Sequence, residues 1–113
     1  HGRESVTINT GGEKVFAEEV EQAIKHPPGV YDALVVGRAS PQWGQEVVAV
    51  VAPAAGATVT LDELRAVAEP HLARYKLPKA VVLAEAISRS PSGKPDYAWA
   101  RQVAAEAVEP REH

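Results

Sequence analysis

The chain has 113 residues and a net charge of −3, and no stretch of it is strongly basic. Its length suits one domain and is small for a self-contained enzyme with several substrates, and its charge argues against a nucleic-acid binder. Cysteine is absent, which excludes disulfides and thiolate sites and fits a cytoplasmic protein. No apolar run approaches the length of a membrane span, and the histidines lack metal-ligand spacing, so we expect no transmembrane segment and no metal site.

The first part of the chain predicts a β-hairpin. Residues 6–9 alternate between apolar and polar side chains, residues 10–13 form a turn, and residues 14–16 return as the second strand. In the turn, Gly11 and Gly12 permit a positive φ or the close approach of another backbone or of a ligand. A plain hairpin turn is the simpler explanation of the two glycines.

A helix is predicted over residues 17–25, because its apolar side chains recur at helical spacing. Glu18 and Glu19 lie in its first turn, where acidic groups suit the helix dipole. We expect Glu18, Glu19 and Glu21 to form a solvated face. The Pro-Pro-Gly sequence at 27–29 ends the helix.

Two strands follow, over residues 30–37 and 46–52, and we expect them to pair antiparallel. The second is almost continuously apolar, which is typical of a central strand buried on both faces. Thr60 and Glu63 then match a capping box, and apolar residues at helical spacing carry the second helix to about Tyr75.

A third strand is predicted over residues 80–84, and a last helix over residues 97–107 with Asp96 as its cap. The tail, residues 108–113, is charged and is expected to fray. This order of elements predicts an α+β domain, with a small sheet of about three strands plus an N-terminal β-hairpin and three helices packed on it.

The loop of residues 88–96 presents a single lysine, Lys94. Prolines restrict φ and Gly93 can adopt a positive φ, so we expect the loop to form a defined turn rather than a flexible loop. A lysine ammonium suits a point contact with phosphate or carboxylate, although Gly-Lys pairs are also common in basic surface turns. A P-loop is excluded, because Ser88 and Pro95 stand where it needs a glycine and a hydroxyl residue.

Four further stretches of sequence are informative as a set. They are Gly2-Arg3 with residues 8–15 and 18–21, His26-Pro27 with residues 30–37, residues 43–49, and residues 75–78 with Ser90-Pro91-Ser92-Gly93-Lys94-Pro95-Asp96. In this order and spacing they resemble the C-terminal domain of the adenylate-forming enzymes, the acyl-CoA synthetase and AMP-binding ligase family. The likeness covers residues 2 to about 104 and is strongest to fatty-acyl or related CoA ligases of actinobacterial type.

The resemblance implies a two-step reaction. A carboxylate attacks the α-phosphate of ATP to give an acyl-adenylate and pyrophosphate, and the thiol of coenzyme A (CoA) then displaces AMP. ATP and CoA are substrates, and Mg²⁺ is expected with ATP, bound outside this chain. Residues 1–113 would form a mobile lid on a larger N-terminal AMP-binding domain, with residues 1–5 as a hinge remnant, and the chain alone is expected to be inactive.

The same resemblance implies roles for single residues in the first step. Lys94 matches the catalytic lysine that enters the active site for adenylation. Arg3 matches an arginine that contacts the nucleotide. Ser5 stands at the hinge position, where the family often has Asp or Lys, so electrostatic steering of the hinge would differ here.

For the second step, the resemblance implies that the lid turns and brings the predicted hairpin to the CoA tunnel. Gly12 matches a glycine whose missing side chain lets the backbone approach the pantetheine arm, and Gly11 belongs to the same CoA-side hairpin. Lys14 stands where some members of the family place a basic residue near a CoA phosphate.

Two alternatives stay open at the level of sequence. The lid could serve the thiol of a carrier protein instead of CoA. The chain could also be a free-standing, non-enzymatic interaction module, with Trp43, Tyr97 and Trp99 as interface anchors.

Overall fold

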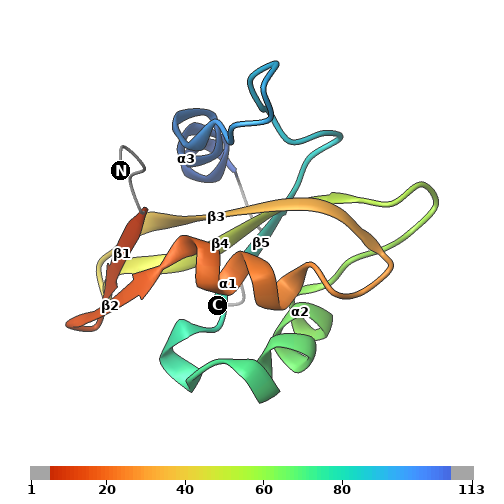
Figure 1. Ribbon diagram of the computed structural model, residues 1–113. Helices are drawn as coiled ribbons and strands as arrows, with labels where there is room; N and C mark the ends of the chain where they lie inside the picture. Colours follow the sequence, from red (N-terminus) through yellow and green to blue (C-terminus); the bar gives the residue numbers. More distant parts are fainter. Residues whose placement is uncertain (1–5, 108–113) are drawn as a thin grey trace.

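The computed structural model describes residues 6–107, shown in Figure 1. The elements in chain order are β1 (Thr7–Thr10), β2 (Glu13–Phe16), α1 (Ala17–Ile24), β3 (Val30–Ser40), β4 (Gly44–Pro53), α2 (Leu61–Ala68), the 3₁₀ turns η1 (Glu69–His71) and η2 (Arg74–Lys76), β5 (Ala80–Leu83) and α3 (Tyr97–Glu106). Arg3, Ser5 and the tail of residues 108–113 lie outside the described residues.

The strands form one mixed sheet. Its order is β2-β1-β4-β3, and β5 pairs in parallel with the edge of β4 that also meets β1. The predicted α+β class is therefore confirmed. A sheet of about three strands is an underestimate, because the hairpin joins the same sheet through the pairing of Thr10 with Gly44 and brings it to five strands.

Helices cover both faces of the sheet, α1 and α2 on one face and α3 on the other (Figure 1). Side chains of β4 alternate between the two layers, with Val47, Ala49 and Val51 beneath α1 and α2 and Val48 and Val50 beneath α3. All of these side chains are fully buried. The prediction of a central strand buried on both faces is confirmed, and so is the antiparallel pairing of β3 with β4.

The acidic face predicted for the first helix is wrong at one position. Glu18 and Glu19 are exposed, but Glu21 is buried on α1. Its carboxylate accepts hydrogen bonds from the Val35 backbone N–H at 2.9 Å and from the Tyr97 hydroxyl at 2.8 Å. Because β3 is the last strand in the order, Glu21 covers a backbone donor at the edge of the sheet.

The second helix is shorter than predicted. Thr60 accepts from the Glu63 backbone N–H and Glu63 accepts from the Thr60 backbone N–H, which confirms the capping box. The α-helix then ends at Ala68, because Pro70 cannot donate to the helix ladder, and two 3₁₀ turns carry the chain onward to Lys76. The predicted continuous helix to Tyr75 is therefore wrong.

Strands β3 and β4 extend further than their predicted bounds and are joined by a tight turn around Gln42. The Asp96 side chain accepts from the Trp99 backbone N–H, which confirms it as the N-cap of α3. Among residues 6–107, no helix combines the length and the apolar content needed to cross a membrane.

Candidate functional site

The turn that carries Lys94 is closed by its own hydrogen bonds. Gly93 N–H donates to the Ser90 carbonyl at 2.8 Å, and Ser90 N–H donates to the Lys94 carbonyl at 2.9 Å. The Lys94 N–H donates to the Ser90 hydroxyl at 3.1 Å. Gly93 has a φ of +91°, a conformation that L side chains rarely adopt. The loop is thus a defined turn, as its Gly and Pro content predicts.

Lys94 projects into solvent from this turn. The residue is exposed, and within the part of the chain that the structure describes its ammonium has no hydrogen-bond or ion-pair partner. A flexible cation on a fixed backbone turn can bind an anion from another molecule or another domain.

Arg89 fastens the turn to the sheet. Its guanidinium makes a bidentate pair with the Asp32 carboxylate on β3, with N···O distances of 2.9 and 2.8 Å. The hydrogen bonds from Arg89 hold the pKa of Asp32 below its usual value, and the same pair raises the pKa of Arg89. The third guanidinium nitrogen donates to the Gly93 carbonyl at 3.2 Å, directly before Lys94.

Tyr97 fastens the other end of the turn. Its hydroxyl donates to Glu21, so the start of α3 is tied to α1 around the edge of β3. Burial raises the pKa of Glu21, a stronger effect than the lowering by hydrogen bonds from Val35 and Tyr97. Burial and the bond to Glu21 also raise the pKa of Tyr97.

The glycine hairpin lies beside a second candidate surface. Gly11 and Gly12 have φ values of +59° and +84°, and the Gly11 N–H donates to the Trp43 carbonyl at 2.8 Å. A Cβ at Gly11 would lie 3.2 Å from the Trp43 ring, whereas a Cβ at Gly12 would meet nothing within 4 Å. The hairpin thus packs on Trp43 at Gly11 and leaves open space at Gly12.

A surface groove of about 480 Å³ adjoins the hairpin. It is lined by Thr10, Gly11, Glu13, Trp43, Arg65, Arg74, Tyr75 and Lys79. The Lys79 ammonium lies 4.9 Å from the centre of the Trp43 ring, and burial lowers its pKa, with a further contribution from Arg65. The Thr10 hydroxyl is buried and, within residues 6–107, has no hydrogen-bond partner.

The groove combines aromatic faces and cations, which suits a phosphate-bearing ligand with an aromatic ring. Sequence reasoning missed Arg65, Arg74 and Lys79, because these residues are far apart in the chain and belong to no local motif. Gly12 and Lys14 are exposed in the same hairpin but do not line the groove.

The two candidate surfaces are widely separated. In Figure 1 the turn before α3 projects above the sheet, on the side of α3, whereas the tip of the β1–β2 hairpin projects at the lower left, on the side of α1 and α2. Along the β3–β4 ladder, Asp32 pairs with Ala52 near one end, and Thr10 of the hairpin pairs with Gly44 at the other end. The structure therefore does not bring Lys94 together with Gly11, Gly12 and Lys14.

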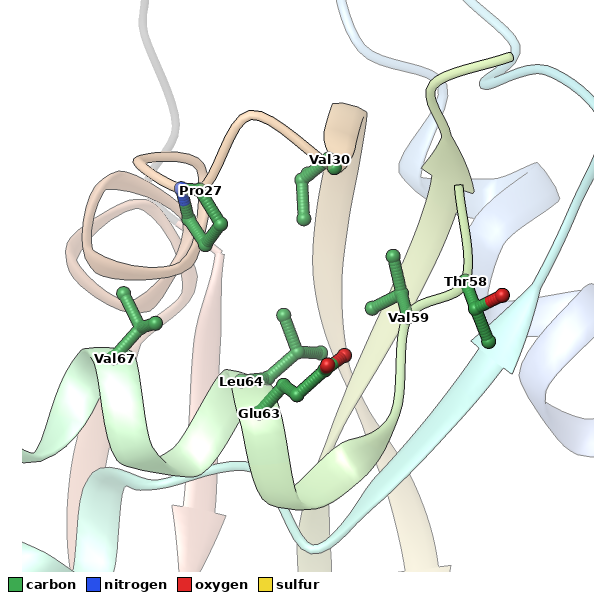
Figure 2. Close-up of a pocket in the computed structure, with 8 residues that line it drawn as sticks. Pro27, Val30, Thr58, Val59, Glu63, Leu64 and Val67 are labelled. Atoms are coloured by element: carbon green, nitrogen blue, oxygen red, sulfur yellow. The ribbon is translucent and has the colours of Figure 1, made fainter. Parts of the chain in front are cut away.

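A third depression, of about 250 Å³, lies between the end of α1 and the start of α2 (Figure 2). Apolar side chains such as Pro27, Val59 and Leu64 point into it, and its one carboxylate, Glu63, already serves the capping box. It offers no group for chemistry. The described part of the chain also holds no cluster of three or more His, Cys, Asp or Glu side chains that could bind a metal ion.

Comparisons with known proteins bear on these surfaces. Residues 19–94 match the family model of the AMP-binding enzyme C-terminal domain. The chain belongs to this family. The family match contains the Lys94 turn and begins within α1, and the AMP-binding enzyme C-terminal domain described here also includes the hairpin that precedes it.

Relatives of this domain include two CoA ligases. The chain is 62% identical over 103 residues to the medium-chain acyl-CoA ligase Mig of Mycobacterium avium, covering 91% of the chain and 19% of that ligase. It is 56% identical over 100 residues to the 3-oxocholest-4-en-26-oate–CoA ligase of Rhodococcus rhodochrous, covering 88% of the chain and 18% of that ligase. The chain thus spans about a fifth of the length of these relatives.

Solved structures share the fold. The domain matches a fatty acyl CoA synthetase of Mycobacterium tuberculosis with a TM-score of 0.78 and 38% identity, over 85% of this chain and 19% of that one. It matches ATP-bound MatB of Rhodopseudomonas palustris with a TM-score of 0.83 and 30% identity, over 93% of this chain and 21% of that one.

Proposed function

We propose that this domain is the mobile lid of an AMP-forming acyl-CoA synthetase that acts on a fatty acid or a related carboxylate. The observation that carries the proposal is an exposed Lys94 on a turn that Arg89 and Tyr97 fasten at both ends. The names of the Mycobacterium avium and Rhodococcus rhodochrous ligases support the class of substrate.

Lys94 supplies the positive charge for adenylation. A carboxylate and a triphosphate repel each other, and a lysine ammonium placed between the attacking oxygen and the α-phosphate lowers that repulsion. It also stabilises charge that develops in the transition state, which is worth most where the lid excludes water. Arg3 is the proposed contact to the nucleotide, and Ser5 is the proposed hinge.

The groove beside the hairpin serves the second step. Arg65, Arg74 and Lys79 suit the phosphates of CoA, and the Trp43 ring offers a face for its adenine. The open space at Gly12 lets the pantetheine arm pass close to the backbone. Lys14, which is exposed on the same hairpin, is the proposed contact to a CoA phosphate.

The proposal assigns the remaining parts of the reaction to a partner domain. The ATP pocket, the Mg²⁺ ion that accompanies ATP and the acyl tunnel belong to the N-terminal AMP-binding domain, to which residues 1–5 connect. The reaction takes place in the cytoplasm, where thiols stay reduced and CoA is a free nucleophile.

The test separates the two half-reactions in a full-length ligase that carries this domain. Lys94→Ala is expected to lower pyrophosphate release by about 10²–10³-fold, by analogy with the loss of one oxyanion donor. Thioester formation from a supplied acyl-adenylate should persist. Arg101→Ala, a change at an exposed cation on α3, is the control and should alter neither rate. An equal loss of both half-reactions in Lys94→Ala would refute the role of Lys94.

A further inference from the structure

The residues of the Lys94 turn itself take no part in the apolar core. Residues 90–95 are all exposed, and the turn consists of small residues, prolines and Lys94 itself. Its internal hydrogen bonds fix its shape but do not fix where it lies on the domain. The ends of the turn are held where Ile87 and Tyr97 pack against the core and where Tyr97 donates to Glu21, and Arg89 makes the contact nearest to Lys94.

Arg89 contacts both the sheet and the turn. Its Nε and Nη2 donate to the Asp32 carboxylate at 2.9 and 2.8 Å, and its Nη1 donates to the Gly93 carbonyl at 3.2 Å. A planar guanidinium held by a bidentate pair has little rotational freedom. Arg89 therefore holds the Gly93 carbonyl, which directly precedes Lys94, at a fixed place relative to β3.

The geometry of β3 directs the Asp32 side chain toward the face of the sheet that carries the Lys94 turn. The β3–β4 register shifts between Val30 and Asp32, so Val30 packs in the α1 and α2 layer while Asp32 follows Leu34 on the α3 side. The Ala33 N–H donates to the Asp32 carboxylate at 2.9 Å, which fixes its rotamer further. Lys25 is a second, looser cation at 3.6 Å.

We infer that Arg89 and Asp32 are positioning residues for Lys94, which hold its backbone where the ammonium reaches the reacting oxygens. The inference rests on the adenylation role proposed for Lys94. Arg89 and Asp32 touch neither ATP nor the carboxylate in this role, and they act only through the turn. The flexible side chain of Lys94 lets its ammonium extend to the reacting oxygens. The Arg89–Asp32 pair, called the clamp below, fixes the position of the Lys94 backbone.

The inference predicts a loss confined to one half-reaction. A lysine displaced by about 1 Å can cost on the order of 100-fold in rate. The groove beside the hairpin is lined by neither Arg89 nor Asp32, so the thioester step should not depend on their contact.

The experiment compares variants in a full-length ligase that carries this domain. Arg89→Ala is expected to lower the kcat for pyrophosphate release by about 10- to 100-fold, with conversion of a supplied acyl-adenylate within about twofold of the parent. Arg89→Lys keeps the charge but cannot form the fork, and should recover only part of the rate. Added guanidinium should restore pyrophosphate release to Arg89→Ala and not to Lys94→Ala.

Asp32→Asn tests the other half of the clamp. It should lower pyrophosphate release, and the Asp32→Asn/Arg89→Ala double variant should be no slower than Arg89→Ala alone, because the two residues act as one unit. Glu19→Gln is the matched control, since it breaks a bidentate contact with Lys76 at 2.9 and 3.0 Å by the same change of acid to amide. It should leave pyrophosphate release unchanged.

The outcomes separate the two proposals. If Lys94→Ala abolishes adenylation and Arg89→Ala leaves it unchanged, the clamp is refuted and the role of Lys94 stands. If Arg89→Ala slows both half-reactions equally, or guanidinium rescue fails, Arg89 is structural and the inference is overturned. If Lys94→Ala itself has no effect on adenylation, the proposed function fails first.

Discussion

Asp32 and Glu21 are two carboxyl groups near the Lys94 turn, and their environments shift their pKa values in opposite directions. Asp32 accepts from a guanidinium, which lowers its pKa, whereas Glu21 is buried, which raises its pKa despite two hydrogen bonds. Folding therefore favours the ionised form of Asp32 and the protonated form of Glu21.

The stability of the chain should respond to pH with opposite signs at these two residues. The Asp32 contribution is present above its unfolded pKa of 3.8 and is lost as pH falls through its lower folded pKa. The Glu21 contribution is present below its unfolded pKa of 4.5 and is lost as pH rises through its higher folded pKa. Thermal unfolding of Asp32→Asn and Glu21→Gln against pH measures both.

For Asp32→Asn, the stability deficit should be about 1–2 kcal/mol near pH 7 and should shrink in acid. For Glu21→Gln, the parent should lose stability relative to the variant as pH rises above 4.5. Parallel profiles for the parent and Glu21→Gln would show that this carboxyl does not titrate differently in the folded state.

Gly12 offers a second test at the scale of one residue. Alanine at its φ of +84° should cost about 1–2 kcal/mol, as a left-handed conformation does for L residues. Gly56 is the matched control, because its φ is +76° and a Cβ there also meets nothing within 4 Å. Gly12→Ala and Gly56→Ala should lower the melting temperature alike, but only Gly12→Ala should slow the thioester half-reaction. If both variants retain it, the hairpin does not face the thiol substrate.

At the scale of elements, the capping box of α2 should contribute to folding without contributing to catalysis. Thr60→Ala removes the hydroxyl that accepts from Glu63 N–H and is expected to cost about 1 kcal/mol in chemical denaturation. Thr58→Ala, at an exposed threonine just before the cap, is the control and should cost less. A slower thioester half-reaction in Thr60→Ala would mean that α2 also positions the groove.

The groove between the hairpin and η2 carries its own prediction. Lys79→Gln removes a cation that faces Trp43 and should raise the KM for CoA by about 10- to 100-fold, the value of a charge-assisted hydrogen bond. Pyrophosphate release should be unaffected. Steady-state kinetics with varied CoA, with Arg101→Gln as a control on the α3 side, measures the effect. An unchanged KM would place the CoA phosphates elsewhere.

At the scale of the whole molecule, the Lys94 turn is bonded to Asp32 near one end of the β3–β4 ladder, whereas the hairpin meets β4 at Gly44, at the other end. One orientation of the domain cannot present both surfaces to the same active site, so the proposed reaction requires the lid to turn between its two steps. The proposed lid contributes one charge and one surface, and the proposal assigns the pocket for ATP to the N-terminal AMP-binding domain.

The isolated chain should therefore be inactive. With ATP, CoA and a medium-chain fatty acid it should release no pyrophosphate, and joined to an N-terminal AMP-binding domain it should release both pyrophosphate and thioester. Coupled assays of the two products measure this. Pyrophosphate release by the chain alone would contradict the assignment of the ATP pocket to another domain.

The sequence determined the features that depend on neighbouring residues. The capping box at Thr60, the cap at Asp96 and the shaped turn around Lys94 each use contacts a few residues apart, so local pattern was sufficient. The alternation of buried layers in β4 is also local, since strand geometry sends successive side chains to opposite faces. The end of the second helix is different, because apolar spacing continues past Ala68 whereas Pro70 cannot donate to the helix ladder.

Tertiary structure alone decided which distant groups meet. Glu21 reads as one more acid of a solvated helix face, yet it is buried because the edge of β3 and the hydroxyl of Tyr97 converge on it from 14 and 76 residues away. Arg89 and Asp32 are 57 residues apart and meet because β3 passes beneath the start of α3. Long-range contacts of this kind follow from how the layers pack, and local sequence pattern carries no record of that packing.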